Sequence, residues 1–224
     1  MAIVFEFDGG IADQIADYLG DLRDKTPAVI AQAVNSTARK ARKALAEDMK
    51  SKYTSTMKTK DYNAAMDIKP RASARKPAAT IRISGAVQSL HKFKTDPTEP
   101  YSGIGMKPNE TRAQVLLAGG TMKMLEKGGI KAFVAKFSSG DVAVVQRTGK
   151  TYSYVENSTR QDGTVRRHTD RKHDQIRKLW SVSVAKMAGT ELKIGTTMRD
   201  DVQEMLQAEL AKQIEKTLKK AGKL

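Results

Sequence analysis

The sequence predicts an α+β fold, in which a long helix near the N-terminus and a second helix at the C-terminus pack with a small antiparallel sheet. Apolar residues recur at three- and four-residue spacing from Thr26 to about Lys52, which is the period of an amphipathic helix. The same period returns between Thr197 and Lys220. Between these two stretches, short runs alternate apolar and polar residues as half-buried strands do. We therefore expect a single α+β domain over residues 1–224.

The N-terminal part is expected to be mainly helical. Ile11 to Leu22 places its apolar residues on one stripe and predicts a short helix. Thr26-Pro27 combines a hydroxyl cap with a proline suited to the first helical position, so it marks the start of the long helix. Lys60 to Ile68 predicts one more short helix. The outer face of the long helix is basic and carries Arg39, Lys40, Arg42, Lys43, Lys50 and Lys52.

The middle of the chain is expected to form the sheet. Residues 79–84 alternate as a strand with Ile81 and Ile83 on one face, and residues 87–93 are its expected partner across Gly85. Two apolar runs at 132–137 and 142–147 flank a four-residue Ser/Gly/Asp turn. This is the strongest hairpin signal in the sequence.

Two segments break this regular pattern. Residues 95–112 are rich in proline and glycine and predict an irregular loop. Residues 150–174 are polar, with Asp162-Gly163 near their centre. They predict either a protruding hairpin, with residues 152–155 paired to 164–166, or an arm that becomes ordered only on assembly.

The composition excludes several classes of protein. With 39% hydrophobic and 5% aromatic residues, the chain can build a core, but a thin one. The absence of cysteine excludes disulfides, cysteine zinc sites and thiol nucleophiles. No stretch approaches the ~18 apolar residues of a membrane span, and the N-terminus lacks the basic region of a signal peptide. We expect a protein without membrane partners.

The charge is strongly positive and unevenly distributed. There are 40 Lys and Arg against 25 Asp and Glu, a net charge of +15, so polyanions and acidic protein faces are the natural partners. Residues 69–94 hold seven basic residues and no acidic one, and residues 166–178 hold six. The candidate contacts for DNA or an acidic partner are Arg71, Arg75, Lys76, Arg82, Lys92, Lys94, Arg166, Arg167, Arg171 and Lys172.

The first 25 residues are acidic instead, with six carboxylates against two basic residues. An acidic N-terminal segment and a basic remainder of the chain favour head-to-tail contact between identical subunits, because surfaces of opposite charge attract. The candidate residues for such a subunit interface are Asp13, Asp17, Asp21 and Asp24.

Catalytic, cofactor and metal motifs are not found in the sequence. It has no phosphate-binding loop, no dinucleotide fingerprint and no nucleophile elbow. The acidic residues from Asp200 to Glu204 are explained by the charge preference of a helix start. His168 and His173 are five residues apart, which fits neither one helix face nor alternate strand positions. We expect no enzyme activity, no cofactor and no metal site.

Several segments in a fixed order resemble a known family. They are the helix segment at 28–35, Arg71-Ala-Ser73, the strand at 79–85, the segments at 89–93 and 132–149, and the segment at 176–187. The most specific are the hairpin ending in Gln146-Arg-Thr-Gly149 and the run Ile176-Arg-Lys-Leu-Trp180. This order resembles the minor tail protein Z family of tailed bacteriophages, also called tail completion proteins. The resemblance covers most of the chain and is interrupted at 95–112 and 150–174.

The resemblance implies a structural virion protein at the head-proximal end of a long tail, in the tail or neck after assembly in the host cytoplasm. There it would support tail maturation, head–tail joining and DNA passage, and it brings no catalytic residues. The implied partners are copies of the chain in a ring, as a hexamer, the neighbouring tail terminator, tail tube or head–tail connector proteins, the tape-measure protein, and transient double-stranded DNA. The alternative is a non-specific DNA-binding protein that uses residues 69–94 and 166–178, although the sequence has no recognised DNA-reading motif.

Overall fold

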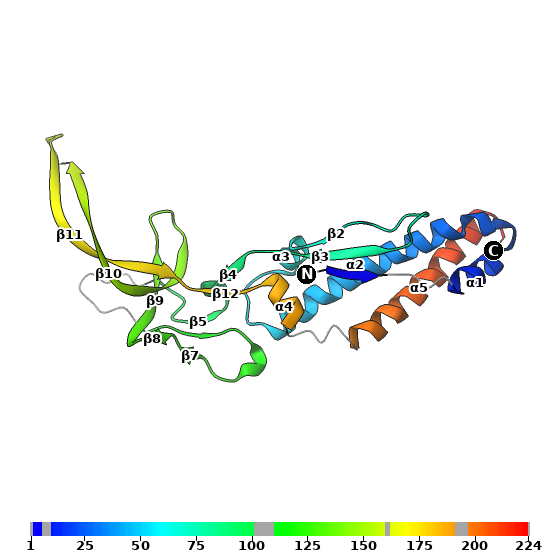
Figure 1. Ribbon diagram of the computed structural model, residues 1–224, viewed down its shortest axis with the longest axis horizontal. Helices are drawn as coiled ribbons and strands as arrows, with labels where there is room; N and C mark the ends of the chain where they lie inside the picture. The colour runs from blue at the N-terminus through cyan, green and yellow to red at the C-terminus, as the bar shows by residue number, and fades with distance from the viewer. Residues whose placement is uncertain (1, 6–9, 101–109, 160–161, 191–196, 224) are drawn as a thin grey trace. The chain divides into compact units, whose positions relative to one another are not determined.

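The computed structural model confirms a mixed fold of helices and small antiparallel sheets, 44% helical and 31% strand (Figure 1). It describes residues 2–5, 10–100, 110–159, 162–190 and 197–223. The chain divides into two compact units. The helical unit comprises Met1–Lys52, Met57–Val87 and Val182–Leu224, and the sheet unit comprises Tyr53–Thr56 and Gln88–Ser181. Neither unit is one continuous stretch, and a single domain over 1–224 stays a prediction.

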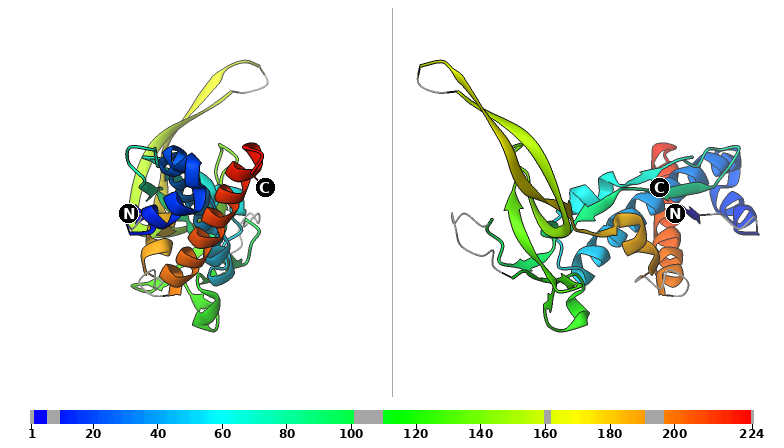
Figure 2. Two further views of the ribbon diagram at one scale, coloured as in Figure 1. Left: turned by 90° about the vertical axis from the view of Figure 1, so that its right-hand side faces the viewer. Right: turned by 60° about the vertical axis from the view of Figure 1, so that its left-hand side comes forward.

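Five α-helices lie in the described residues of the helical unit. They are α1 (Gly10–Leu19), α2 (Thr26–Lys52), α3 (Thr59–Ala64), α4 (Val184–Thr190) and α5 (Thr197–Lys220). The predicted long helix and C-terminal helix are both confirmed. Figures 1 and 2 show α5 running alongside α2. None of the helices in the described residues is long and apolar enough to cross a membrane.

The entry into α2 differs from the prediction. The chain leaves α1 at Gly20, whose φ of +55° lies in the left-handed region, and continues as a 3₁₀ helix over Gly20–Lys25. Thr26 is itself helical, and its backbone N–H donates to the carbonyl of Arg23. Its buried hydroxyl makes no hydrogen bond within the described residues, so the predicted hydroxyl cap is wrong. One helix passes directly into the next, and no separate cap forms.

A three-stranded antiparallel sheet belongs to the helical unit. Its order is β1 (Ala2–Phe5), β3 (Ala79–Ile83) and β2 (Met66–Ile68), with Ile3 and Ile68 both opposite Ile81. The strand predicted at 79–84 is confirmed. Its predicted partner at 87–93 is wrong, because β1 and β2 occupy both edges of β3. The predicted helix at 60–68 is wrong over its last three residues, which form β2.

The core of the helical unit lies along one face of α2. Eight of its residues are at most 2% exposed, namely Ala33, Val34, Thr37, Ala38, Ala41, Leu45, Ala46 and Met49. The side chains of Ile81 and Ile83 on β3 are buried to the same degree. The spacing of apolar residues along α2 therefore identified the buried face of this helix correctly.

The sheet unit is built from two antiparallel sheets. The first has the order β5 (Lys94–Asp96), β6 (Arg112–Gln114) and β7 (Lys123–Met124). The second has the order β11 (Val165–Lys178), β10 (Val142–Thr159), β9 (Ile130–Lys136) and β8 (Glu126–Lys127). Short 3₁₀ turns lie at Leu90–Lys92 and Leu117–Gly119. The chain passes between the units within β4 (Val87–Ser89) and β12 (Trp180–Ser183).

The predicted hairpin at 132–147 is confirmed as β9 and β10. The turn between them is closed by the N–H of Phe137 bonding to the carbonyl of Asp141 and by the N–H of Gly140 bonding to the carbonyl of Phe137, both at 2.8 Å. The predicted loop at 95–112 has β5 and β6 at its ends, and these strands pair with each other. Its middle, residues 101–109, lies outside the described residues.

Candidate functional site

Gln146 joins three strands of the sheet unit. It lies on β10 opposite Ala132 of β9 and Arg177 of β11, and only 3% of the residue is exposed. Its amide nitrogen donates to the carbonyl of Ile130 at 2.5 Å, and its amide oxygen accepts from the Arg177 guanidinium at 2.6 Å. A buried amide must be hydrogen-bonded to avoid a desolvation cost, and here both ends are satisfied. The base of the β10–β11 hairpin is thereby fixed.

Two cations brace the hairpin base by stacking on aromatic rings. The Arg147 guanidinium lies 5.2 Å from the centre of the Phe133 ring, and its Nε is 2.8 Å from a carboxylate oxygen of Asp174. Lys178 lies 4.6 Å from the centre of the Phe137 ring and pairs with Asp141 in the turn. The hydrogen bond from Lys178 lowers the pKa of Asp141 below its ordinary value of 3.8. These contacts tie β9, β10 and β11 together at one end.

Beyond Gln146 the hairpin is a two-stranded ribbon. β9 pairs only with Val142 to Gln146 of β10, whereas the pairing of β10 with β11 continues to Thr159 opposite Val165. Figures 1 and 2 show this part as a long twisted ribbon. Among the described side chains of β10 and β11, three large apolar residues are exposed, namely Tyr152, Val165 and Ile176, with 51%, 62% and 38% of their surface accessible. An isolated two-stranded ribbon is marginally stable in water, so this one gains from a partner surface.

The pairing predicted within this ribbon is wrong in register. Tyr152 lies opposite His173, and Arg166 lies opposite Ser158. The reason is the place of the turn, where the Asp162 carboxylate accepts from the N–H of Thr164 at 2.9 Å and Gly163 has a φ of +82°. Because the turn is centred near residue 162, residues equally far from it pair, and 152–155 cannot reach 164–166.

The ten predicted contacts are divided between the two units. Arg71, Arg75 and Lys76 lie in the loop between β2 and β3, and Arg82 lies on β3 opposite Asp67. The others belong to the sheet unit: Lys92 and Lys94 near β5, and Arg166, Arg167, Arg171 and Lys172 along β11. The acid-free stretch 69–94 is therefore not one continuous surface of a single unit.

Arg71 lies close to cations that were not among the ten predicted contacts for DNA or an acidic partner. It lines a pocket of the helical unit with Arg39, Arg42 and Lys216. The signal in the sequence was the basic face of the long helix, on which Arg39 and Arg42 are three residues apart. A basic helix face is usually only solvated, and this pattern therefore did not single them out.

The four acidic candidates are all exposed. Asp13 and Asp17 lie on α1, and Asp21 and Asp24 lie on the 3₁₀ helix that follows. Asp21 has a partner within the chain, since its carboxylate is 2.6 Å from the ammonium of Lys223. The hydrogen bond from Lys223 lowers the pKa of Asp21 below 3.8. All four stay predictions for contact with another subunit, Asp21 included, because 92% of its side chain is exposed.

Metal-binding geometry is not present in the described part of the chain. No group of three or more His, Asp or Glu side chains there is placed to hold an ion. The side chains of His168 and His173 lie outside the described ones. No protein-family model, curated protein or solved structure matches this chain.

Proposed function

We propose that this chain is a structural virion protein, a tail completion or neck component of a long-tailed bacteriophage. The observation that carries the proposal joins sequence and structure. The two segments most specific to the resemblance, at 146–149 and 176–180, are far apart in the sequence, yet Gln146 and Arg177 face each other at the hairpin base. The resembling residues therefore form one structural feature. The mixed helix and sheet content agrees with the expected fold class.

The ribbon beyond that base suits assembly. In the described part of the chain no further strand pairs with either edge of the ribbon, and its exposed apolar residues favour docking on a second copy or a neighbouring tail protein. A closed ring needs two unlike faces on each subunit, and the exposed carboxylates of Asp13, Asp17 and Asp24 supply one acidic face. The proposed partners are copies in a sixfold ring and the terminator, tube or connector proteins above and below it. The tape-measure protein is a further proposed partner, contact with DNA would be transient, and the proposal assigns no catalytic step to the chain.

A shortened ribbon tests this function. Thr151 lies opposite Asp174, so residues 152–173 can be replaced by a two-residue Asn-Gly turn that leaves the hairpin base intact. Phage that lack the native gene for this chain are supplied with either form, and the particles are imaged by cryo-electron microscopy. With the native chain we expect joined heads and tails and a ring of this chain at the junction. With the shortened chain we expect separate heads and tails.

Two controls keep the test decisive. The purified shortened chain should retain the circular dichroism of the helices and unfold within a few degrees of the native chain, since the helical unit is unchanged. Its failure to join heads and tails would then reflect the missing ribbon. A normal yield of joined infectious particles with the shortened chain contradicts the role of the ribbon. A native particle without a ring of this chain at the tail–head junction overturns the proposed function itself.

A further inference from the structure

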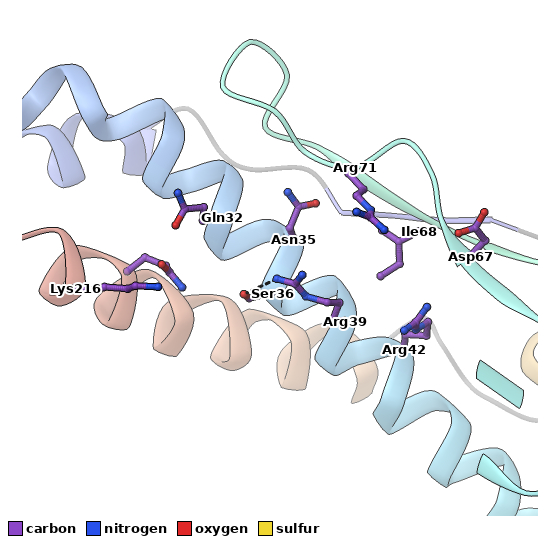
Figure 3. A pocket seen from close by; sticks show the side chains of 10 residues that line it. Gln32, Asn35, Ser36, Arg39, Arg42, Asp67, Ile68, Arg71 and Lys216 are labelled. Atoms are coloured by element: carbon purple, nitrogen blue, oxygen red, sulfur yellow. Dashed lines mark hydrogen bonds between the residues drawn. The ribbon is translucent and has the colours of Figure 1, made fainter. Parts of the chain in front are cut away.

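The helical unit contains a pocket of about 440 Å³ with a strongly basic lining (Figure 3). It lies between α2, α5, β2 and the loop that follows β2. Its positively charged side chains, here called the pocket cations, are Arg39, Arg42, Arg71 and Lys216. Asp67 is the one carboxylate among the lining residues.

A side-chain clamp brings the pocket cations together. Asn35, Arg39 and Arg42 recur at four- and three-residue spacing on one face of α2. The Asn35 amide donates to the carbonyl of Ala72 and accepts from the N–H of Ala72, both at 2.9 Å. This double hydrogen bond holds the loop after β2 against α2, and Arg71 is the residue next to the clamp. Figure 3 shows the labelled side chains arranged around the space between the helices and the loop.

The charge of the pocket cations is not balanced within the described residues. None of the four forms an ion pair there. Asp67 is paired with Lys69 at 3.0 Å, and the hydrogen bond from Lys69, with a smaller contribution from the charge of Arg71, lowers the pKa of Asp67. The single carboxylate of the lining is thus already paired with a lysine that does not line the pocket.

Hydrogen-bonding capacity is also left over. Arg39 donates to the hydroxyl of Ser36 at 3.2 Å, and Arg42 donates through one terminal nitrogen to the carbonyl of Met66 at 3.3 Å. The Nε of Arg42 is buried and has no acceptor in the described part of the chain. A buried donor without an acceptor costs free energy, so the Arg42 guanidinium is not fully satisfied by the residues around it.

We propose that this pocket binds a doubly charged phosphate group. Arginine forks match the oxygens of phosphate in a bidentate manner, and a phosphate offers several acceptors to donors that converge from different directions. A carboxylate or a backbone phosphodiester carries one negative charge, whereas a phosphate monoester or free phosphate carries close to two at neutral pH. Four uncompensated cations favour the higher charge. The volume is within the range of pockets that hold small ligands.

The first experiment measures phosphate binding by the full-length chain. Calorimetric titration with inorganic phosphate, in a chloride buffer of constant ionic strength near pH 7.5, should give saturable binding. Arg71→Gln should weaken it at least tenfold. The matched control is Arg75→Gln, which removes the same charge from the same loop at an exposed residue that does not line the pocket. Its dissociation constant should stay within about twofold of the native value.

A second pair of variants tests the opposite wall. Lys216→Gln on α5 should weaken binding, whereas Lys212→Gln, one turn earlier and outside the lining, should not. The proposal is overturned if phosphate binds no better than chloride, or if all four variants weaken binding equally, which is the result expected for a diffuse positive field. It is also overturned if a glutamate-rich peptide binds at the pocket and phosphate does not.

A third experiment distinguishes the possible sources of the phosphate group. Short DNA duplexes with a 5′-phosphate or a 5′-hydroxyl are compared as competitors. Tighter binding of the 5′-phosphate duplex, lost in Arg71→Gln, assigns the pocket to the end of a nucleic acid. Equal binding of the two duplexes, with inorganic phosphate still lost in Arg71→Gln, assigns it to a small free phosphate compound. The ribbon lies in the other unit, so the chain with the shortened ribbon should bind phosphate as tightly as the native chain. The phosphate proposal and the proposed tail function can therefore fail or hold independently.

Discussion

Glu209 on α5 is a buried carboxylate whose charge is balanced by Lys40 on α2. The two groups are 2.7 Å apart, and the side chain of Glu209 is only 5% exposed. The hydrogen bond from Lys40 is the main cause that lowers the pKa of Glu209 below its ordinary value of 4.5, against the opposing effect of burial. A carboxylate with a lowered folded-state pKa stabilises the protein above its unfolded pKa. That contribution is lost as the pH falls below 4.5 through the folded-state value.

Replacing Lys40 should therefore destabilise the protein in a pH-dependent way. We expect Lys40→Met to lower the free energy of unfolding at pH 7 by about 1.5–3 kcal/mol, because a buried carboxylate loses a charged hydrogen-bond donor. The loss should be smaller at pH 3.5 than at pH 7, because protons compete with Lys40 for the carboxylate as the pH falls below 4.5. Urea unfolding at both pH values measures it. Lys219→Met is the control, since Lys219 and Glu215 are both exposed and solvent screening makes their pair contribute far less. An equal loss by Lys40→Met at both pH values would contradict the role of the pair.

The buried face of α2 is the main packing surface of the helical unit. Leu45 is 0% exposed, whereas two residues earlier Lys43 has 71% of its side chain accessible. We expect Leu45→Ala to lower the free energy of unfolding by about 2–5 kcal/mol, through lost burial and the cavity left behind. Lys43→Ala, on the same helix, should change it by less than about 0.5 kcal/mol. Chemical denaturation of both variants checks this. A small effect of Leu45→Ala would mean that neighbouring side chains fill the space.

Elements with strong local patterns were predictable, and short strands with distant partners were not. The helix from Thr26 and the hairpin around Ser138–Asp141 each carry their signal within one stretch of sequence. β1 and β2 have only four and three residues, and both depend on pairing with β3, which lies far along the chain from β1. Nothing local shows that both edges of β3 are occupied. For that reason the residues after Gly85 were wrongly predicted to pair with β3.

The candidate site was predictable only in part, for a similar reason. Arg71 was identified from the run of basic residues around it. Arg39 and Arg42 were visible only as part of a charged helix face, which ordinarily faces solvent. What converts that face into a pocket wall is the pair of hydrogen bonds between Asn35 and Ala72, 37 residues apart. A long-range clamp of this kind leaves no periodic pattern in the sequence.

The connectivity of the whole chain makes the two units depend on each other. The helical unit is assembled from three stretches of sequence, and residues 88–181 of the sheet unit are inserted between two of them. Unfolding the sheet unit alone would leave those stretches joined by a long flexible loop, whose closure costs entropy. We therefore expect the units to unfold in one cooperative transition, as a single domain would.

The chain carries separate probes for the two units. Its one tryptophan, Trp180, belongs to the sheet unit, whereas the five α-helices of the described residues belong to the helical unit. In urea, tryptophan fluorescence and far-ultraviolet circular dichroism should give the same midpoint. Leu45→Ala in the helical unit and Val144→Ala in the sheet unit, both at residues with 0% exposure, should each move the two curves together. A shift of only the dichroism curve by Leu45→Ala would show instead that the units are two domains that unfold separately. The lost packing would then destabilise the helical unit and leave the stability of the sheet unit unchanged.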